Sequence, residues 1–340
     1  MSIINTFLSI VITVITFGLL ILVHEFGHYI VAKKCGIGVN EFSIGMGPTI
    51  YKKQGKETTF YIKALPIGGF VKLEGEDEDA AKDNQKAFGN KTKLQRIAVL
   101  LAGAVMNILC GFIIVIIINS FVGGFVTTTI DSVSLEEQTV LQEGDKIVSI
   151  DGYGVMNYTD LNFAASNIAE EKFTAKVIRD GERITLENVP LVKTDTGYKI
   201  GINLATESKN VWTVLKNSVT ESISIIRFVW QSIVYLVTGR VGINELSGPV
   251  GITVLVKQTV EYGALSVLNL IAFIALNLGV MNLLPIPALD GGRIFMIVVE
   301  GIFGKPIPQK YEAIVHLVGF VLLMGLTVFV FINDIIKVFK

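Results

Sequence analysis

Four long stretches without a charged side chain punctuate this sequence. They span residues 3–23, 97–130, 262–289 and 313–333, and the only titratable group within the last of them is His316. A helix needs about 20 apolar residues to cross the hydrocarbon core of a bilayer. The pattern therefore predicts a polytopic α-helical membrane protein with about four transmembrane helices.

The first apolar stretch lacks the features of a cleaved signal peptide. No lysine or arginine precedes it, and it continues directly into HEFGHYIVAKK, without a small-residue cleavage site. We therefore expect it to be retained as the first transmembrane helix.

Composition agrees with the hydropathy pattern. Apolar residues (AVILMFWYC) make up 51% of the chain and charged residues 17%, against about 25% charged residues in soluble domains. The 29 basic and 30 acidic side chains nearly cancel, which gives no general attraction to nucleic acid. We expect membrane lipid around the chain and no nucleic-acid partner. Two cysteines, Cys35 and Cys110, are too few for a disulfide framework.

Lysines gather between the first two apolar stretches. Residues 33–96 contain eleven lysines and one arginine, and such a cluster marks the cytoplasmic side of a membrane protein. Two crossings then place residues 124–262 outside, together with both termini. The same loop contains an acidic tract at residues 74–79, which we interpret as a solvated linker.

The region outside the membrane predicts a small β domain. The sequence FTAKVIRDGERITLENV alternates apolar and polar residues around Asp180 and Gly181, a pattern typical of a β-hairpin. The sequence GDKIVSIDG at residues 144–152 resembles the GDxIxxIxG stretch of PDZ domains. Another type of small β domain is the alternative.

Residues 211–240 place apolar side chains at helical spacing, interrupted by Lys216, Glu221 and Arg227. These charged side chains argue against a fifth transmembrane helix. We expect an amphipathic helix at the outer membrane surface.

The strongest chemical signal is HEFGH at residues 24–28. The i, i+4 spacing places His24 and His28 on one helical face, where both imidazoles can bind one Zn²⁺, and Glu25 lies beside them to accept a proton from water. Polar groups within an apolar helix are costly unless they are paired or metal-bound. This cost favours a metal site over two histidines that snorkel at a helix end.

Zinc requires a third protein ligand. His316 stands alone in an apolar stretch, and we expect it to be packed or hydrogen-bonded rather than metal-bound. Asp290 is the better candidate because it follows two prolines that break the helix in NLLPIPALDGG. A simple Asp-Gly-Gly turn is the alternative.

Together these motifs resemble the site-2 protease family of intramembrane zinc metalloproteases, in the regulator-of-sigma-E protease branch that carries a PDZ domain. The resemblance extends over nearly the whole chain. The sequences that carry it are HEFGH, GIGVNEFSIGMGP, ALPIGGFVKLEGED, the PDZ-like segment, SGPVGI and MNLLPIPALDGG.

The resemblance implies roles for individual residues. His24, His28 and Asp290 would bind zinc, and Glu25 would be the catalytic base. Residues 36–72 would form a β-loop that dips into the membrane and pairs with an unwound substrate. The positions implicated in holding the substrate are Asn282, Pro285 and Pro287.

The expected fold is thus a polytopic α-helical membrane protein with a membrane-associated β-loop and an inserted extracytoplasmic PDZ-like β domain. Its parts are a first transmembrane helix with HExxH (1–32), the β-loop region (33–96), a second transmembrane helix (97–122), the PDZ-like domain (124–205), the amphipathic helix and SGPVGI linker (206–262), a third transmembrane helix with NxxPxPxLDGG (263–310) and a fourth (311–340).

The expected function is that of a zinc metalloendopeptidase in the cell membrane that cuts within transmembrane segments. Its substrates would be single-span proteins, such as anti-sigma factors and signal-peptide remnants, in regulated intramembrane proteolysis. Two other hypotheses stay open at this point. One is a catalytically silent, membrane-tethered PDZ adaptor, and the other is a metal or proton transporter, against which no inverted repeat of HEFGH appears in the second half.

Overall fold

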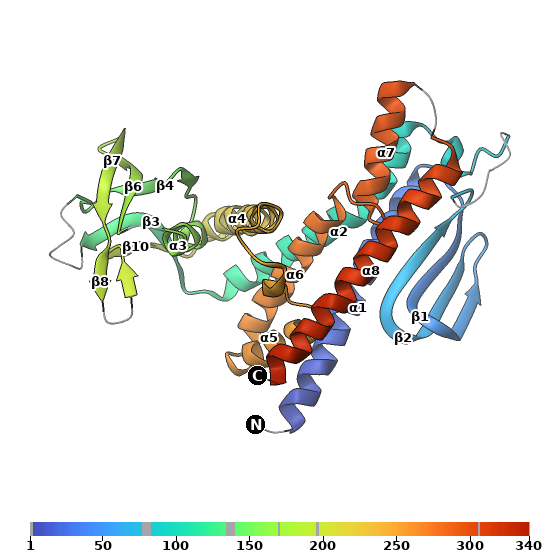
Figure 1. Ribbon diagram of the computed structural model, residues 1–340, viewed down its shortest axis with the longest axis horizontal. Helices are drawn as coiled ribbons and strands as arrows, with labels where there is room; N and C mark the ends of the chain where they lie inside the picture. The colour runs from blue at the N-terminus through green and yellow to red at the C-terminus, as the bar shows by residue number, and fades with distance from the viewer. Residues whose placement is uncertain are drawn as a thin grey trace. The chain divides into compact units, whose positions relative to one another are not determined.

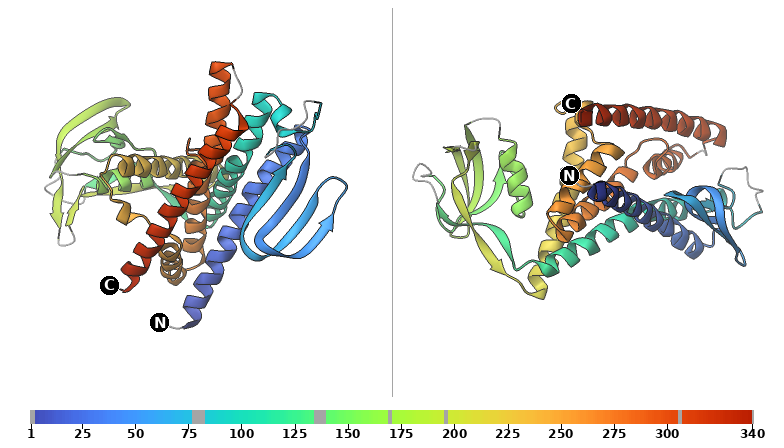
Figure 2. Two further views of the ribbon diagram at one scale, coloured as in Figure 1. Left: turned by 45° about the vertical axis from the view of Figure 1, so that its right-hand side comes forward. Right: turned by 90° about the horizontal axis from the view of Figure 1, so that it is seen from below.

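The computed structural model describes residues 3–76, 83–133, 140–168, 171–194, 197–304 and 307–339. The chain forms two compact units: unit 1 combines Met1–Ile114 with Trp230–Lys340, and unit 2 is Val115–Val229. Figures 1 and 2 show the elements of each unit.

Four helices are long and apolar enough to cross a membrane, as judged by length and composition. They lie in α1 (Ile3–Lys34), α2 (Lys93–Phe121), α6 (Ala264–Asn282) and α8 (Gln309–Phe339). The described part of the chain thus contains the four long apolar helices that the sequence predicted.

Between α1 and α2, unit 1 contains a curled sheet of β1 (Val39–Gln54) and β2 (Thr59–Leu73), followed by the short helix η1 (Phe88–Asn90). Residues 41–44 of β1 pair with β2 twice, once with 69–72 and once with 59–62. This sheet lies against α1 (Figure 1). At the turn between the strands, hydrogen bonds from Lys33 and Lys86 lower the pKa of Glu57 to about 2, and Lys33 thereby ties the turn to the end of α1.

The prediction that the acidic tract after β2 is a solvated linker is wrong for the residues of the tract that the structure describes, 74–76. Glu74 accepts a hydrogen bond from the Asn84 side chain, and Glu76 forms an ion pair with Arg293 of α7 (Asp290–Phe303). Residues 77–79 of the tract lie outside the described residues. Both glutamates therefore hold the tract to other parts of unit 1 rather than leaving it to solvent.

The SGPVGI sequence starts a helix that the sequence pattern did not predict. After η2 (Ile243–Glu245), α5 (Pro249–Glu261) begins within this motif. The Asp334 carboxylate of α8 accepts hydrogen bonds from the backbone N–H groups of Gly248 and Gly251, at 2.9 and 2.8 Å. A Cβ on either glycine would lie within about 3.0 Å of that carboxylate. The motif is therefore glycine-rich because it must approach a buried aspartate closely.

Unit 2 is built on a β-sheet closed by a short helix. The sheet has the order β10-β3-β4-β6-β7, with β5 paired to β4. Its elements are β3 (Gly124–Val133), β4 (Lys146–Ile150), β5 (Tyr153–Gly154), α3 (Tyr158–Ser166), β6 (Lys172–Arg179), β7 (Glu182–Pro190) and β10 (Ile202–Ser208), with a separate ribbon of β8 (Val192–Thr194) and β9 (Gly197–Lys199).

The predicted hairpin in unit 2 is confirmed. Strands β6 and β7 pair from Arg179 and Glu182 outwards, and both turn residues, Asp180 and Gly181, have positive φ. Two positive φ values are typical of a type I′ turn, whose twist matches that of the strands.

The core of unit 2 lies between the sheet and α3. Leu161 of α3 is buried there with Ile147 of β4 and Val177 of β6.

A buried ion pair stabilises one end of this sheet. Burial alone would raise the pKa of the Asp145 carboxyl, but hydrogen bonds from Arg179 and from the backbone N–H of Gln142 hold this pKa below its ordinary value. Arg179 donates from both Nε and Nη2, at 2.7 and 2.8 Å. The aspartate of the GDKIVSIDG motif therefore joins β4 to β6.

Helix α4 (Val211–Val237) contributes to both units. Its small polar side chains, such as Ser218 and Ser222, are buried, while Trp212, Val219 and Trp230 are exposed. In the folded chain, α4 is therefore amphipathic, with small polar side chains on its buried face and large apolar side chains on its exposed face. That α4 lies at the outer membrane surface stays a prediction.

Candidate metal centre

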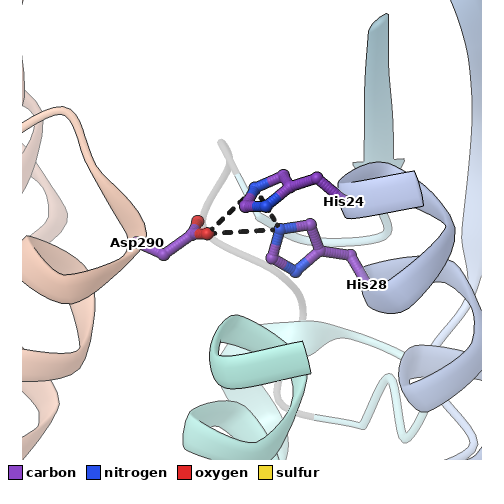
Figure 3. A group of neighbouring side chains, drawn as sticks. All are labelled: His24, His28 and Asp290. Carbon is purple, nitrogen blue, oxygen red and sulfur yellow. Dashed lines mark hydrogen bonds and ion pairs between the residues drawn. The ribbon is translucent and has the colours of Figure 1, made fainter. Parts of the chain in front are cut away.

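Three side chains from two helices of unit 1 converge on one point (Figure 3). His24 and His28 extend from α1, and Asp290 is the first residue of α7. Asp290 Oδ2 lies 3.2 Å from His24 Nε2 and 3.3 Å from His28 Nε2, and the two Nε2 atoms are 3.1 Å apart. Within the described residues this is the one group of three metal-binding side chains with such spacing.

These separations fit a zinc ion. Zinc binds histidine nitrogen and carboxylate oxygen at about 2.0–2.1 Å in a tetrahedron, which requires ligand atoms about 3.3 Å apart. Asp290 Oδ2 is also buried, and no described residue donates a hydrogen bond to it. A buried carboxylate oxygen in that state is costly unless a cation is near. The three side chains therefore suit a shared metal ion.

A backbone carbonyl of α2 orients His28. Its Nδ1 lies 2.8 Å from the Val99 carbonyl oxygen, and a carbonyl only accepts, so Nδ1 carries the proton. The Nε2 lone pair is then left facing Asp290 and His24. Such a hydrogen bond from the distal nitrogen fixes the tautomer and the ring orientation of a metal-binding histidine.

Gly103 of α2 makes room for both imidazoles. A Cβ at position 103 would overlap His28 Nε2 and lie against the His24 ring. Next to His28 in α1, Gly27 similarly approaches the Ala102 carbonyl of α2. Glycine at both positions lets the two helices come close enough for the histidines to sit between them.

Two glycines also place Asp290. The backbone carbonyl of Leu284 would overlap a Cβ on Gly291, and that of Ile286 would overlap a Cβ on Gly292. The loop after α6 therefore folds back over the first turn of α7 at very short range. The Asp-Gly-Gly sequence starts a helix in the structure and presents Asp290 at its N-terminal end.

Glu25 lies between the histidines and the sheet. Its carboxyl is near enough to both imidazoles and to Asp290 for their charges to act on it, and it accepts a hydrogen bond from the backbone of Val71 in β2. A Cβ on Gly69, also in β2, would lie 3.5 Å from Glu25 Cγ. The end of β2 therefore runs beside the acidic side chain, which is placed to exchange a proton with a group at the cluster.

The other residues singled out in the sequence lie in and around the loop before Asp290. Asn282 ends α6, Pro285 is exposed in the following loop, and Pro287 packs against Gly319 of α8. His316 is hydrogen-bonded, as expected, through Nδ1 to the backbone N–H of Ala288 at 2.9 Å. The region expected as one helix at 263–310 holds α6, a loop and α7.

An ion-pair network that the sequence analysis did not find surrounds α7. Arg293 pairs with Glu76, and Arg96 of α2 pairs with Glu300 at 3.1 Å. Glu300 is buried, and its backbone carbonyl also accepts a hydrogen bond from Lys93. These contacts fix α7, and hence its first residue, against α2 and the end of the β-loop.

Comparison with known proteins explains the arrangement. Residues 12–326 match the family described as Peptidase family M50. The chain belongs to this family. It is 36% identical to a protein of Clostridium acetobutylicum that bears the name of a zinc metalloprotease, over 97% of this chain and 98% of that protein.

Two further relatives are similar over their whole length. The chain is 29% identical to Regulator of sigma-W protease RasP of Bacillus subtilis and 29% identical to Zinc metalloprotease RasP of Bacillus licheniformis, in each case over 97% of this chain and 99% of the relative. This member of peptidase family M50 is accordingly an intramembrane zinc metalloprotease of the site-2 protease type. Family membership argues against the adaptor and transporter hypotheses.

Replacing Gly103 with alanine should disturb the metal centre. The added methyl group overlaps both imidazoles, so we expect zinc affinity to fall by about tenfold or more, as for changes that misplace metal ligands. Zinc content and affinity of the purified variant measure the effect. Gly325→Ala in α8 is the matched control, because a Cβ there meets nothing within 4 Å. Unchanged zinc affinity in Gly103→Ala would contradict the close approach of α2.

Proposed function

We propose that His24, His28 and Asp290 hold the zinc ion of this M50 peptidase and that Glu25 is its catalytic base. The observation that carries the proposal is the meeting of three ligand atoms within 3.3 Å of one another. Glu25 follows His24 in the same helix, and the charges of all three side chains act on its carboxyl.

The residues of the cluster divide the chemistry between them. Zinc, when bound, polarises the scissile carbonyl and lowers the pKa of a water molecule to about 7. Glu25 accepts the proton of the attacking water and passes it to the leaving amine. His28 keeps its ring fixed through the Val99 carbonyl, and Asp290 supplies a negative charge that offsets part of the metal's charge.

The β-loop is proposed to hold the substrate. Residues 69–73 of β2 pair with β1 on one side only, and this stretch runs beside Glu25. An unwound substrate segment adds to the open edge through main-chain hydrogen bonds, which depend little on its side chains. The remaining proposed substrate contacts come from the loop before Asp290: Asn282, Pro285 and Pro287.

The proposed substrates are single-span membrane proteins, including anti-sigma factors and signal-peptide remnants. The name of the Bacillus subtilis relative, Regulator of sigma-W protease, supports a role in regulated intramembrane proteolysis. We infer that the β-loop lies on the cytoplasmic side of the cell membrane, with unit 2 and both termini outside; the lysine-rich segment at residues 33–96 supports this orientation.

Unit 2 is proposed to be a PDZ-like domain that selects substrates. A groove of about 580 Å³ lies between α3 and β10 and is lined by Leu161, Ile202 and Leu204 among others. Strand β10 is at the edge of the sheet, so one of its sides is open to an extended peptide. The domain would admit trimmed substrates and exclude those with bulky outer domains.

Glu25→Gln should keep zinc and lose proteolysis, because an amide cannot accept the proton from water while the three ligands stay in place. The expected loss is at least about 10²-fold, measured with a single-span substrate in detergent or liposomes. Asp290→Ala should lose both zinc and activity. Cleavage by Glu25→Gln at the normal rate would remove Glu25 as the base, and full zinc content in Asp290→Ala would move the third ligand elsewhere.

The orientation is testable with single cysteines in a chain lacking Cys35 and Cys110. Gln54 and Glu182 are both exposed. In intact cells, a membrane-impermeant thiol reagent should label Glu182→Cys and leave Gln54→Cys unlabelled until the cells are opened. The reverse pattern would invert the topology.

Removing residues 127–205 tests the selective role of unit 2. Val126 and Thr206 are paired neighbours on β3 and β10, so a short flexible linker can join them without spreading the flanking helices. Cleavage of a pre-trimmed substrate should persist, and cleavage of the untrimmed one should increase. Loss of both activities at normal zinc content would show that unit 2 belongs to the catalytic assembly.

A further inference from the structure

The loop that delivers Asp290 has an unfavourable backbone conformation. Ala288, two residues before Asp290, has φ of +74°. Residues with a Cβ rarely adopt this left-handed region, and they persist there only when the surroundings impose it. Contacts around Ala288 must therefore hold the loop in place.

His316 supplies such a contact. The backbone N–H of Ala288 donates to His316 Nδ1 at 2.9 Å. Nδ1 must then carry the lone pair and Nε2 the proton. Nε2 is buried and has no hydrogen-bond partner among the residues that the structure describes. The bond from Ala288 to Nδ1 is therefore the contact through which the ring can hold the loop.

Helix α8 meets the loop at a second point three residues further on. Gly319 lies so close to Pro287 that a Cβ would overlap the proline ring and its carbonyl oxygen. The same loop also lies against α7, where the carbonyl of Ile286 would overlap a Cβ on Gly292. The loop is therefore fixed between α7 and α8, and Ala288 is where its backbone N–H meets a side chain.

We propose that His316 is a positioning residue for the metal centre: it fixes Ala288 in its left-handed conformation and thereby sets the position of Asp290. His316 is not one of the three metal-binding side chains brought together in the described chain. It acts through two residues of backbone. The inference rests on the proposed role of Asp290 as a zinc ligand.

The test compares His316→Leu with His316→Asn in the full-length protein. Leucine removes the acceptor, whereas the asparagine Oδ1 can occupy a position close to that of Nδ1. We expect zinc affinity, measured by competition with a chelator, to fall by about ten- to a hundredfold in the leucine variant, as is typical when a group that orients a ligand is lost. The asparagine variant should regain most of that loss.

A second readout reports the ligand geometry directly. In the cobalt-substituted protein, the d–d absorption bands should shift in His316→Leu and return towards the wild-type spectrum in His316→Asn. Leu317→Ala is the control, because Leu317 is 62% exposed on the same helix, and it should leave affinity and spectrum unchanged.

A third variant keeps the test informative if leucine prevents folding. His316→Gln retains a polar amide but places it one atom further from the backbone than asparagine does, so it should behave as the leucine variant in zinc affinity. Ala288→Gly should reduce the effect of either loss, since glycine adopts positive φ without strain.

Specific results would overturn the inference. Wild-type zinc affinity and cobalt spectrum in both His316→Leu and His316→Gln would do so, as would failure of His316→Asn to differ from them. The proposed function fails separately: in that case Asp290→Ala binds zinc as tightly as the wild-type protein, whatever the His316 variants show.

Discussion

Every polar group within the hydrocarbon of a membrane needs a partner, because no water is present to replace one. This demand shapes unit 1. Polar groups of its helices and of the loop before α7 meet partners from distant segments: His28 meets the Val99 carbonyl, Asp334 meets the N–H groups that start α5, and Ala288 meets His316. Asp290 Oδ2 is one of the few buried side-chain atoms among the described residues that lack a hydrogen bond, and two Nε2 atoms face it. An unsatisfied oxygen of this kind is what a metal-binding site provides.

Small residues make these meetings possible. At Gly103 the side chains of α1 come within contact of the α2 backbone, and at Gly291 and Gly292 a loop folds onto the first turn of α7. Because helices in lipid gain little from the hydrophobic effect, close packing at glycine and specific polar contacts supply much of their association. The site and the helix packing therefore depend on the same positions.

The sequence predicted the features that are local. The two histidines of HEFGH are one helical turn apart, so their spacing alone predicts that they share a face. The four apolar stretches are uninterrupted runs, and Asp180-Gly181 is sufficient to predict a hairpin. The proline-containing motif also indicated Asp290, although not that its glycines lie inside a helix. The missed features are pairings between distant segments. Glu76 looked like part of a solvated acidic tract because its partner, Arg293, is more than 200 residues away. Nothing near Gly103 or in SGPVGI shows which side chain approaches those glycines.

Helix α8 exposes most of its apolar side chains, yet contacts at two points fix the direction of its axis within unit 1. One attachment is at His316 and Gly319, and the other at Asp334, where Asn333 also donates to the Asn244 carbonyl. Eighteen residues of helix separate His316 from Asp334, or about 27 Å at 1.5 Å per residue. Because a helix is stiff, two contacts this far apart fix the direction of its axis, and a displacement of one end also moves the other. The intervening lipid-facing surface can then vary in sequence while the axis of the helix stays fixed.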